Sequence, residues 1–388
     1  MVTVLDDRRD GFARLVGRDL GLREYLDAVD RAMRRLVPFE LGCVLSLDPA
    51  TVLPTSHFSR ELDIEHLMLI VANEFLEDDV NKFADLARRS PPVATLRQAT
   101  NGDPTRSRRH TGLLTEFGFA DGDELRAVFR DGDVVWGAIA IHRREGAFTD
   151  SEVELVADAG PAIARGIRRA ILRSALAHGH DPEAPGLILL RADSSVETST
   201  AQADRWVSEL FDEGLTVNAM PMTVVSVAAR ARQALAAGAD GSASVRLPRR
   251  SGGWLRLDAS VLDDEDPRVA VIISPAREPE VASLIVEIYG LSNREREVTR
   301  LVLHGHSTAE IGATLHVSNY TVQDHLKSIF GKVGVRSRRE LVSQLFLQQW
   351  APRLAAGLGP RADGWFADRA PRDPIGPGPI DDPRPAQP

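Results

Sequence analysis

Residues 307–333 read STAEIGATLHVSNYTVQDHLKSIFGKV and contain the starts of two short helices. Ser307 and Glu310 have the spacing of a capping box, in which the serine accepts an exposed amide of the first turn and the glutamate reaches back to the cap. Ser318 predicts the start of the next helix. Only residues 316–319 connect the two, and so tight a connection between short helices indicates a helix-turn-helix.

The flanking residues predict one more helix on each side of this pair. Ser292 with Glu295 and Ser337 with Glu340 repeat the capping-box spacing. The first helix is expected to stop at Gly305. Apolar residues recur at helical spacing in all four predicted helices, at Val298, Leu301 and Val302, at Ile311 and Leu315, at Val322, Leu326, Ile329 and Val333, and at Leu341, Val342 and Leu345.

Four motifs lie in this all-α, four-helix segment: LSNREREV at 291–298, GHSTAEI at 305–311, VSNYTVQDH at 317–325 and VRSRREL at 335–341. Together they resemble the LuxR-type DNA-binding domain, through all four helices without a gap. The resemblance implies a LuxR-type helix-turn-helix over residues 287–350 that binds double-stranded DNA. It also implies a homodimer, because the fourth helix commonly forms the dimer contact in this family.

The third predicted helix carries the candidate base contacts. Burial of Val322, Leu326 and Ile329 leaves Gln323, Asp324 and Lys327 on the opposite side, near the helix N-terminus that enters the major groove. A glutamine can pair with an adenine edge, a lysine with guanine or a phosphate, and an aspartate with cytosine. The family resemblance points to the same three positions.

Candidate contacts to the DNA backbone surround these positions. Hydroxyl groups of Ser318, Tyr320 and Thr321 lie where they can hold phosphates, Lys332 can add a charge contact, and first-turn amides favour an anion. Asp324 would repel a phosphate unless it lies over a base edge. Such repulsion suits a regulator that depends on dimerisation for tight binding. The full set of predicted DNA-binding residues is Ser307, Thr308, Ser318, Asn319, Tyr320, Thr321, Gln323, Asp324, Lys327 and Lys332.

Residues 19–177 have the element order of an α+β domain. Asp131-Gly132-Asp133 predicts a hairpin turn, and Thr149 with Glu152 predicts the capped start of a long closing helix. The order resembles a GAF domain, a small-molecule-sensing fold, most closely over residues 124–164. The expected helices are 20–37, 64–88 and 149–177, and the expected strands are 41–47, 52–57, 125–130 and 134–142.

A smaller α+β domain is expected over residues 185–276, and its element order looks like a reduced PAS domain. Residues 357–388 repeat Pro, Gly, Asp and Arg with little apolar content, so we predict a disordered tail. The expected strands of the middle domain are 187–191, 196–199, 244–247, 253–260 and 269–274, and its expected helices are 201–210 and 222–237.

Composition narrows the class of protein. The 388 residues suffice for two or three domains, and no run approaches the ~20 apolar residues that span a bilayer, so we expect a cytoplasmic protein without a membrane anchor. The net charge of -9 does not itself suggest DNA binding, but residues 287–350 hold eight Lys and Arg against six Asp and Glu. Cys43, the one cysteine, is expected to be a buried small hydrophobe.

Other residue patterns point to structure rather than chemistry. His304, His306, Glu310 and His316 lack the His-Glu-x-x-His spacing of a metal site. The cationic run 106–110 is interpreted as a solvated loop. Trp136, Phe129 and Phe39 are expected in the core rather than in a pocket. Because phosphate-loop, nucleophile-elbow and Cys-x-x-Cys motifs are absent, we predict no enzyme.

The sequence therefore predicts a transcription regulator in which a sensory region controls the helix-turn-helix. A small-molecule effector and RNA polymerase are further expected partners, while the sequence specifies neither the effector nor a cofactor. One alternative is a signalling adaptor, whose sensor domains bind a metabolite and whose helical module binds a protein. Loss of Gln323 and Lys327 would abolish DNA binding in the first interpretation and matter little in the second.

Overall fold

The computed structural model describes residues 11–62, 67–176, 184–210, 216–217, 220–262, 268–276, 289–303 and 305–342. The chain divides into two compact units at the Gly290–Leu291 junction. The predicted tail 357–388, residue 304 and the end of the fourth predicted helix, residues 343–350, lie outside the described residues.

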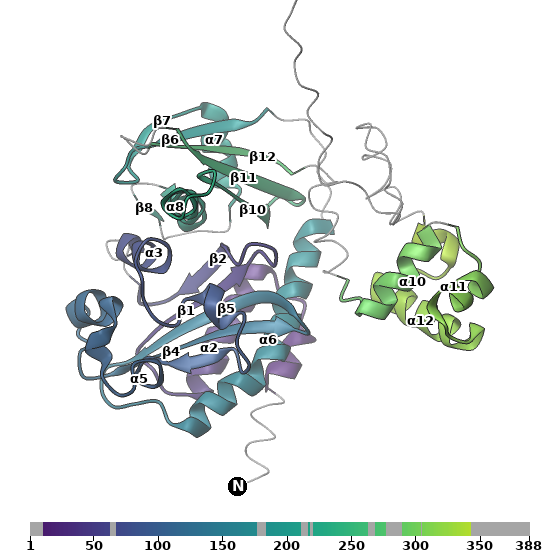
Figure 1. Cartoon of the computed structure of the whole chain (residues 1–388), viewed down its shortest axis with the longest axis horizontal. Coiled ribbons are helices and arrows are strands. Elements are labelled where there is room, and N and C mark those ends of the chain that lie inside the picture. Colours follow the sequence, from purple (N-terminus) through teal and green to yellow (C-terminus); the bar gives the residue numbers. More distant parts are fainter. Residues whose placement is uncertain are drawn as a thin grey trace, which may run out of the picture. The chain divides into compact units, whose positions relative to one another are not determined.

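The first sheet of the N-terminal unit has the strand order β2-β1-β5-β4-β3, and its paired strands are antiparallel (Figure 1). The hairpin predicted at Gly132 is confirmed: Asp131 pairs with Val134, and Gly132 takes a positive φ of 63°. The strands are β1 (Leu41–Leu47), β2 (Pro54–Ser59), β3 (Val93–Thr95), β4 (Asp123–Asp131) and β5 (Val134–Arg143).

Helices α2 (Leu22–Leu36) and α6 (Asp150–Leu176), both predicted from the sequence, cover one face of this sheet. The capping box of α6 is confirmed, since Glu152 N donates to Thr149 Oγ1 at 3.3 Å and Thr149 N donates to the Glu152 carboxylate at 2.8 Å. The core on this face includes Trp136, Phe129 and Phe39, so their predicted place in the core is also confirmed.

The opposite face of the sheet is buried too, under helix α3 (Leu67–Phe75) and the short helix α4 (Phe83–Leu86). The single helix predicted over 64–88 is therefore wrong. The chain turns between the two helices, where Asn81 has a φ of 57° and the Asp79 carboxylate accepts the amide of Arg109 at 2.7 Å. Strand β2 begins at residue 54 rather than 52 because Val52 has a left-handed φ of 59°.

The segment between β3 and β4 contains short helical turns that the sequence analysis did not predict. They are α5 (Leu96–Ala99), Pro104–Arg106 and His110–Leu114. The cationic run at 106–110 lies here, and the interpretation of it as a solvated loop is wrong in part. Ser107, Arg109 and His110 are buried, whereas only Arg106 and Arg108 face solvent.

The second sheet confirms every element predicted for residues 185–276. Its order is β10-β11-β12-β6-β7 (Figure 1). When the five strands of each sheet are numbered in chain order, both sheets have the same strand order, 2-1-5-4-3. A small hairpin of β8 (Thr216–Val217) and β9 (Met220–Pro221) was not predicted. The remaining elements are β6 (Gly186–Leu190), β7 (Val196–Ser199), α7 (Ala201–Ser208), α8 (Met222–Ala236), β10 (Ser242–Pro248), β11 (Trp254–Val261) and β12 (Val269–Pro275).

Helix α8 joins the two halves of this unit. It packs on β10, β11 and β12 of its own sheet and also on α3 and β2. Residues 222–229 are all buried, as expected for a helix that is covered on more than one side. Asp48 at the end of β1 and Arg246 in β10 form an ion pair at 2.8 Å that also connects the two halves.

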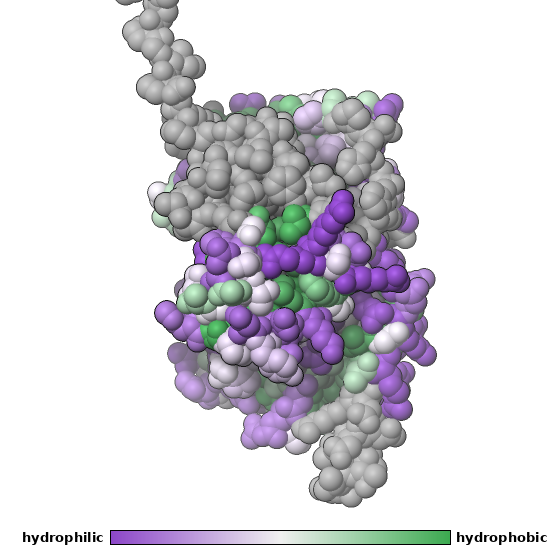
Figure 2. Space-filling model, turned by 90° about the vertical axis from the view of Figure 1, so that its right-hand side faces the viewer, coloured by the Kyte–Doolittle hydropathy of each residue, from purple (hydrophilic) through white to green (hydrophobic). Residues whose placement is uncertain are grey.

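The C-terminal unit contains α10 (Asn293–Leu303), α11 (Thr308–Leu315), α12 (Asn319–Val333) and a further helical segment over 338–342. Across the described residues, no helix combines the length and the apolar character needed to cross a membrane. Figure 2 shows hydrophilic side chains over much of the described surface on one face of the protein, interrupted by smaller hydrophobic areas.

Candidate nucleic-acid interface

The turn between α11 and α12 is formed by three residues, one fewer than predicted. His316 ends α11 in the left-handed conformation, with φ 54°, and Val317 N donates to Gly312 O at 3.0 Å. A Cβ on Gly312 would lie 2.9 Å from Val317 O and from the Asn319 side chain. Glycine at this position therefore lets the two helices approach closely.

Serine caps start the helices of this unit, as predicted. Ser292 with Glu295 and Ser307 with Glu310 each make both hydrogen bonds of a capping box, with serine amide to glutamate distances of 2.6 and 2.7 Å. Ser318 accepts the Thr321 amide at 3.1 Å.

The third predicted box, at Ser337, forms only in part. Ser337 Oγ accepts the Glu340 amide at 3.1 Å, but the Glu340 carboxylate accepts from the amide of Arg336 instead of that of Ser337. The predicted cap is therefore present, while the reciprocal bond has moved by one residue.

Helix α12 buries one face and exposes the other. Val322, Leu326, Ile329 and Val333 are its buried residues. Gln323, Asp324 and Lys327 are exposed on the other side, where the sequence predicted them. Tyr320 is also strongly exposed, at 73%. The arrangement presents an amide, a carboxylate, an ammonium and an aromatic hydroxyl together on the first turns of one helix, while their contact with DNA stays a prediction.

The remaining predicted residues divide into two groups. Ser307 and Ser318 use their hydroxyl groups as helix caps, and Ser318 also shares a hydrogen bond with Thr321 at 2.9 Å. Asn319 is exposed beside them and Thr308 is half-buried. Ser307 and Thr308 therefore lie at the start of α11, and Ser318 and Asn319 lie at the turn that starts α12.

Lys332 has a different partner from the predicted phosphate. Its ammonium donates to the Glu295 carboxylate at 2.6 Å and so ties α12 to α10. Glu295 is 4% exposed and also accepts from Ser328 at 2.7 Å. Burial alone would raise the pKa of Glu295, but hydrogen bonds from Lys332, Ser328 and the Ser292 amide outweigh it and lower the pKa to about 2. The sequence analysis identified Glu295 only as part of a cap.

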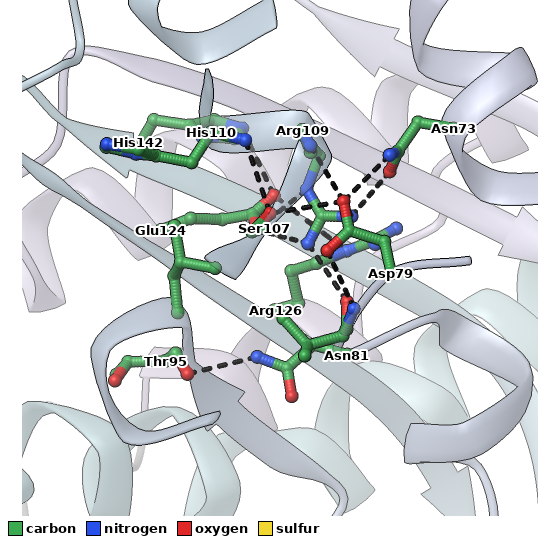
Figure 3. Close-up of polar contacts among 12 residues, drawn as sticks. Asn73, Asp79, Asn81, Thr95, Ser107, Arg109, His110, Glu124, Arg126 and His142 are labelled. Carbon is green, nitrogen blue, oxygen red and sulfur yellow. Dashed lines mark hydrogen bonds and ion pairs between the residues drawn. The ribbon is translucent and has the colours of Figure 1, made fainter. Parts of the chain in front are cut away.

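A buried polar cluster in the N-terminal unit also escaped the sequence analysis (Figure 3). Arg109 lies at its centre, 5% exposed, and donates to Glu124 at 2.7 and 3.0 Å and to Asn73 at 2.6 Å. Burial would raise the pKa of Glu124, but the charges of Arg109 and Arg126 hold it below its ordinary value. These residues come from different elements, so no local spacing could have revealed the cluster.

Two further predictions concern metal and cysteine chemistry. Among the described residues, no group of three or more His, Cys, Asp or Glu side chains is placed to hold a metal ion. Cys43 is half-buried rather than fully buried, and it packs against the core between the first sheet and helices α3 and α8, where it lines a cavity.

Comparisons with known proteins concern mainly the C-terminal unit. The family described as "Bacterial regulatory proteins, luxR family" matches residues 290–345. A putative HTH-type transcriptional regulator from Aeromonas salmonicida is 46% identical over 57 residues, which are 15% of this chain and 29% of that protein. The chain thus spans less than a third of the length of this relative. Among solved structures, a GAF domain/HD domain protein from Geobacter sulfurreducens is similar over 42% of this chain and 98% of that chain, with 20% identity and a TM-score of 0.30.

Another relative is covered over most of its length. The spore germination protein GerE of Bacillus subtilis is 38% identical over 55 residues, which are 14% of this chain and 74% of GerE. Residues 290–345, which match the luxR family, contain the capped helices α10, α11 and α12 described above. The chain belongs to the LuxR family of bacterial regulatory proteins.

Proposed function

We propose that this protein is a DNA-binding transcription regulator whose C-terminal helix-turn-helix, residues 287–350, reads the major groove. The observation that carries the proposal is the exposed face of α12, where Gln323, Asp324 and Lys327 follow directly on the Ser318 cap. An amide, a carboxylate and an ammonium are the groups that recognise base edges. The Aeromonas salmonicida relative is named a putative HTH-type transcriptional regulator, and the match to the luxR family, residues 290–345, includes this helix.

The N-terminal unit is the sensory part in this proposal. Residues 19–177 form a GAF-like domain and residues 185–276 a PAS-like domain. Two observations support this: each region contains a five-stranded antiparallel sheet with the same relative strand order, and the first sheet borders a cavity with polar groups. Such mixed apolar and polar cavities are typical of small-molecule sites.

Effector binding would change DNA affinity through dimerisation or through exposure of α12, with a coupling free energy of ~1–3 kcal/mol, as is typical of allosteric proteins. The protein would act in the cytoplasm as a homodimer on a two-fold DNA site, with the exposed neighbours of Leu341 in the dimer contact and with RNA polymerase as a further partner; Leu341 itself is buried in its own unit. No enzymatic step is part of the proposal.

Selection of fragmented genomic DNA by the purified full-length protein, at two salt concentrations, tests the proposal. The wild type should enrich a shared, roughly palindromic sequence and lose affinity as salt rises. The double variant Gln323→Ala/Lys327→Glu should enrich nothing. A matched control, Gln202→Ala/Arg205→Glu, makes the same changes on α7 and should select as the wild type does.

Each result separates the two functional classes. If the wild type and the α12 variant select the same fragments, base reading by α12 is refuted. If neither selects DNA with or without candidate effectors, the signalling adaptor becomes the better explanation. Repeating the selection with residues 280–350 alone then distinguishes an adaptor from a regulator whose sensory unit prevents binding.

A further inference from the structure

A cavity of about 70 Å³ lies between the first sheet and helices α3 and α8. Its walls are mainly apolar, with Leu45, Phe75 and Phe83 from the first half of the unit and Met222 from α8. A cavity of 150 Å³ holds benzene, which has six heavy atoms, so this space of less than half that volume suits a molecule of about three heavy atoms. Because α8 belongs to the second half, both halves of the N-terminal unit contribute to the cavity.

Three buried side chains in the cavity wall have hydrogen-bonding atoms without a partner among the described residues. They are Nε and Nη1 of Arg126, Nδ1 of His142 and Oγ of Ser226. The three residues are 4%, 8% and 0% exposed. A buried polar atom without a hydrogen bond is destabilising, so a bound molecule that satisfies these atoms gains affinity from the new hydrogen bonds.

Arg126 is held in place by its other contacts. Its Nη2 donates to Glu74 at 2.7 Å, and its guanidinium lies over the Phe83 ring, 3.8 Å from the centroid. Its Nε is 4.0 Å from the Glu124 carboxylate, which is too far for a hydrogen bond. The guanidinium therefore has a fixed orientation, and its Nε and Nη1 donor atoms lack an acceptor within the described part of the chain. An oxygen atom of a bound molecule can serve as that acceptor.

The charges around the cavity disfavour an anion as that acceptor. Glu74, Glu124 and the neighbouring Asp79 supply three carboxylates, against the two guanidinium groups of Arg109 and Arg126. Burial lowers the pKa of His142 to about 4, since the attraction of Glu124 does not offset it, so this imidazole is neutral near pH 7. An anionic ligand would place a fourth negative charge in the same low-dielectric region.

We propose that this cavity binds a small uncharged organic molecule with a carbonyl or hydroxyl oxygen, which accepts from Arg126 and contacts Ser226 on α8. The proposal rests on the sensory role proposed above and specifies the chemical class of the effector. It also gives the effector a direct contact with both halves of the unit, because Arg126 lies on β4 and Ser226 on α8.

The test is a titration of the full-length protein, labelled with ¹³C at the methionine methyl groups, with formamide and with formate. The two probes have the same number of heavy atoms but differ in charge. The methyl resonance of Met222 reports on the cavity, and that of Met33, which is buried in the core on the opposite face of the sheet, is the internal control. Formamide at millimolar concentration should shift the Met222 resonance and leave that of Met33 unchanged, whereas the carboxylate should shift neither.

Two serine variants separate a specific contact from a general loss of structure. Ser226→Ala removes from the cavity wall a buried hydroxyl group that has no hydrogen-bond partner among the described residues. Ser56→Ala removes a similar buried hydroxyl group in β2 that does not line the cavity. Ser226→Ala should weaken the binding of formamide about threefold to tenfold, and Ser56→Ala should leave it unchanged. Arg126→Lys, which keeps a positive charge for Glu74, should weaken binding at least tenfold.

Three results would overturn the proposal. A larger Met222 shift with the carboxylate would exclude an uncharged ligand. No shift with either probe would mean that the cavity holds only structural water. Equal weakening by Ser226→Ala and Ser56→Ala would show that the cavity wall makes no specific contact. All three are measured without DNA, so their outcome is independent of whether residues 287–350 select DNA.

Discussion

Glu295→Gln should destabilise the helix-turn-helix, because it removes a carboxylate whose ionised form is stabilised by its surroundings. The pKa of this carboxyl group falls from the ordinary 4.5 to about 2 in the folded protein. One pKa unit corresponds to about 1.4 kcal/mol, so the difference amounts to about 3 kcal/mol. Because Lys332 is 38% exposed, solvent screens part of the interaction, and we expect a loss of ~1–3 kcal/mol at pH 7.

The pH dependence follows from the direction of the shift. Because the pKa of Glu295 is lower in the folded than in the unfolded protein, the carboxylate contributes its full stabilisation at pH values above the unfolded-state pKa of about 4.5. This contribution is lost as the pH falls from about 4.5 toward about 2. The stability difference between the wild type and Glu295→Gln should therefore be constant between pH 5 and 7. It should begin to narrow below about pH 4.5.

Urea unfolding of the full-length protein labelled with 3-fluorotyrosine measures this effect in each unit separately. Of the three tyrosines, Tyr320 lies in α12 and Tyr25 in the core of the N-terminal unit. With a urea dependence of ~1 kcal/mol per molar for a small domain, the midpoint at Tyr320 should fall by ~1–3 M, and that at Tyr25 should not change.

The matched control is Glu297→Gln in the same helix. Glu297 is exposed and forms only a surface ion pair with Arg294, so its loss should cost less than about 0.5 kcal/mol. Two results would refute the assigned role of the buried carboxylate. One is a urea midpoint at Tyr320 that Glu295→Gln leaves unchanged at pH 7; the other is a stability difference between wild type and variant that does not narrow below pH 4.5.

Three further predictions follow from the same contacts. Gly312→Ala should destabilise the C-terminal unit by about 1–3 kcal/mol, because the added Cβ would lie 2.9 Å from Val317 O in the turn. Gly331→Ala in α12, whose added Cβ would have no neighbouring atom within 4 Å, should be neutral or stabilising. Tyrosine-resolved urea unfolding measures both effects. Lys327→Ala should weaken DNA binding about uniformly across sequences and reduce the salt slope by about one if it contacts a phosphate; a slope equal to the wild type would contradict that contact. Arg109→Met should cost about 3–5 kcal/mol in the N-terminal unit by leaving buried carboxylates without their cation, and the exposed neighbour Arg108→Met should have no measurable effect on the same unfolding curve.

The elements of the C-terminal unit were predictable because short-range contacts determine them. The caps at Ser307 and Ser318 act within three residues, and the apolar spacing of α12 places its buried and exposed faces without further information. The Glu295–Lys332 pair was not predictable, because its partners are far apart in the sequence and a residue that caps a helix locally gives no sign of a second, distant contact.

The N-terminal unit shows the same division between local and distant contacts. The hairpin turn at Gly132 and the cap at Thr149 carried enough local information to place β4, β5 and α6. The helix predicted over 64–88 failed because its apolar spacing continues across residues 76–82, while Asp79 turns the chain to meet Arg109 from a later segment. A buried charge requires its partner, and here that requirement overrides helical periodicity.

The position of α8 determines what an effector can do in this protein. A ligand changes a conformational equilibrium only by the difference between its affinities for the two states. A molecule that contacted Arg126 alone would distinguish only conformations of the first sheet, which is already held by the ion pairs of Arg109 and Arg126. Ser226 is the polar group of the cavity wall that belongs to α8, and α8 packs on both halves of the unit. Contact with Ser226 therefore makes binding depend on how α8 lies against the first sheet, so the packing of α8 is the structural variable to which effector binding would be coupled.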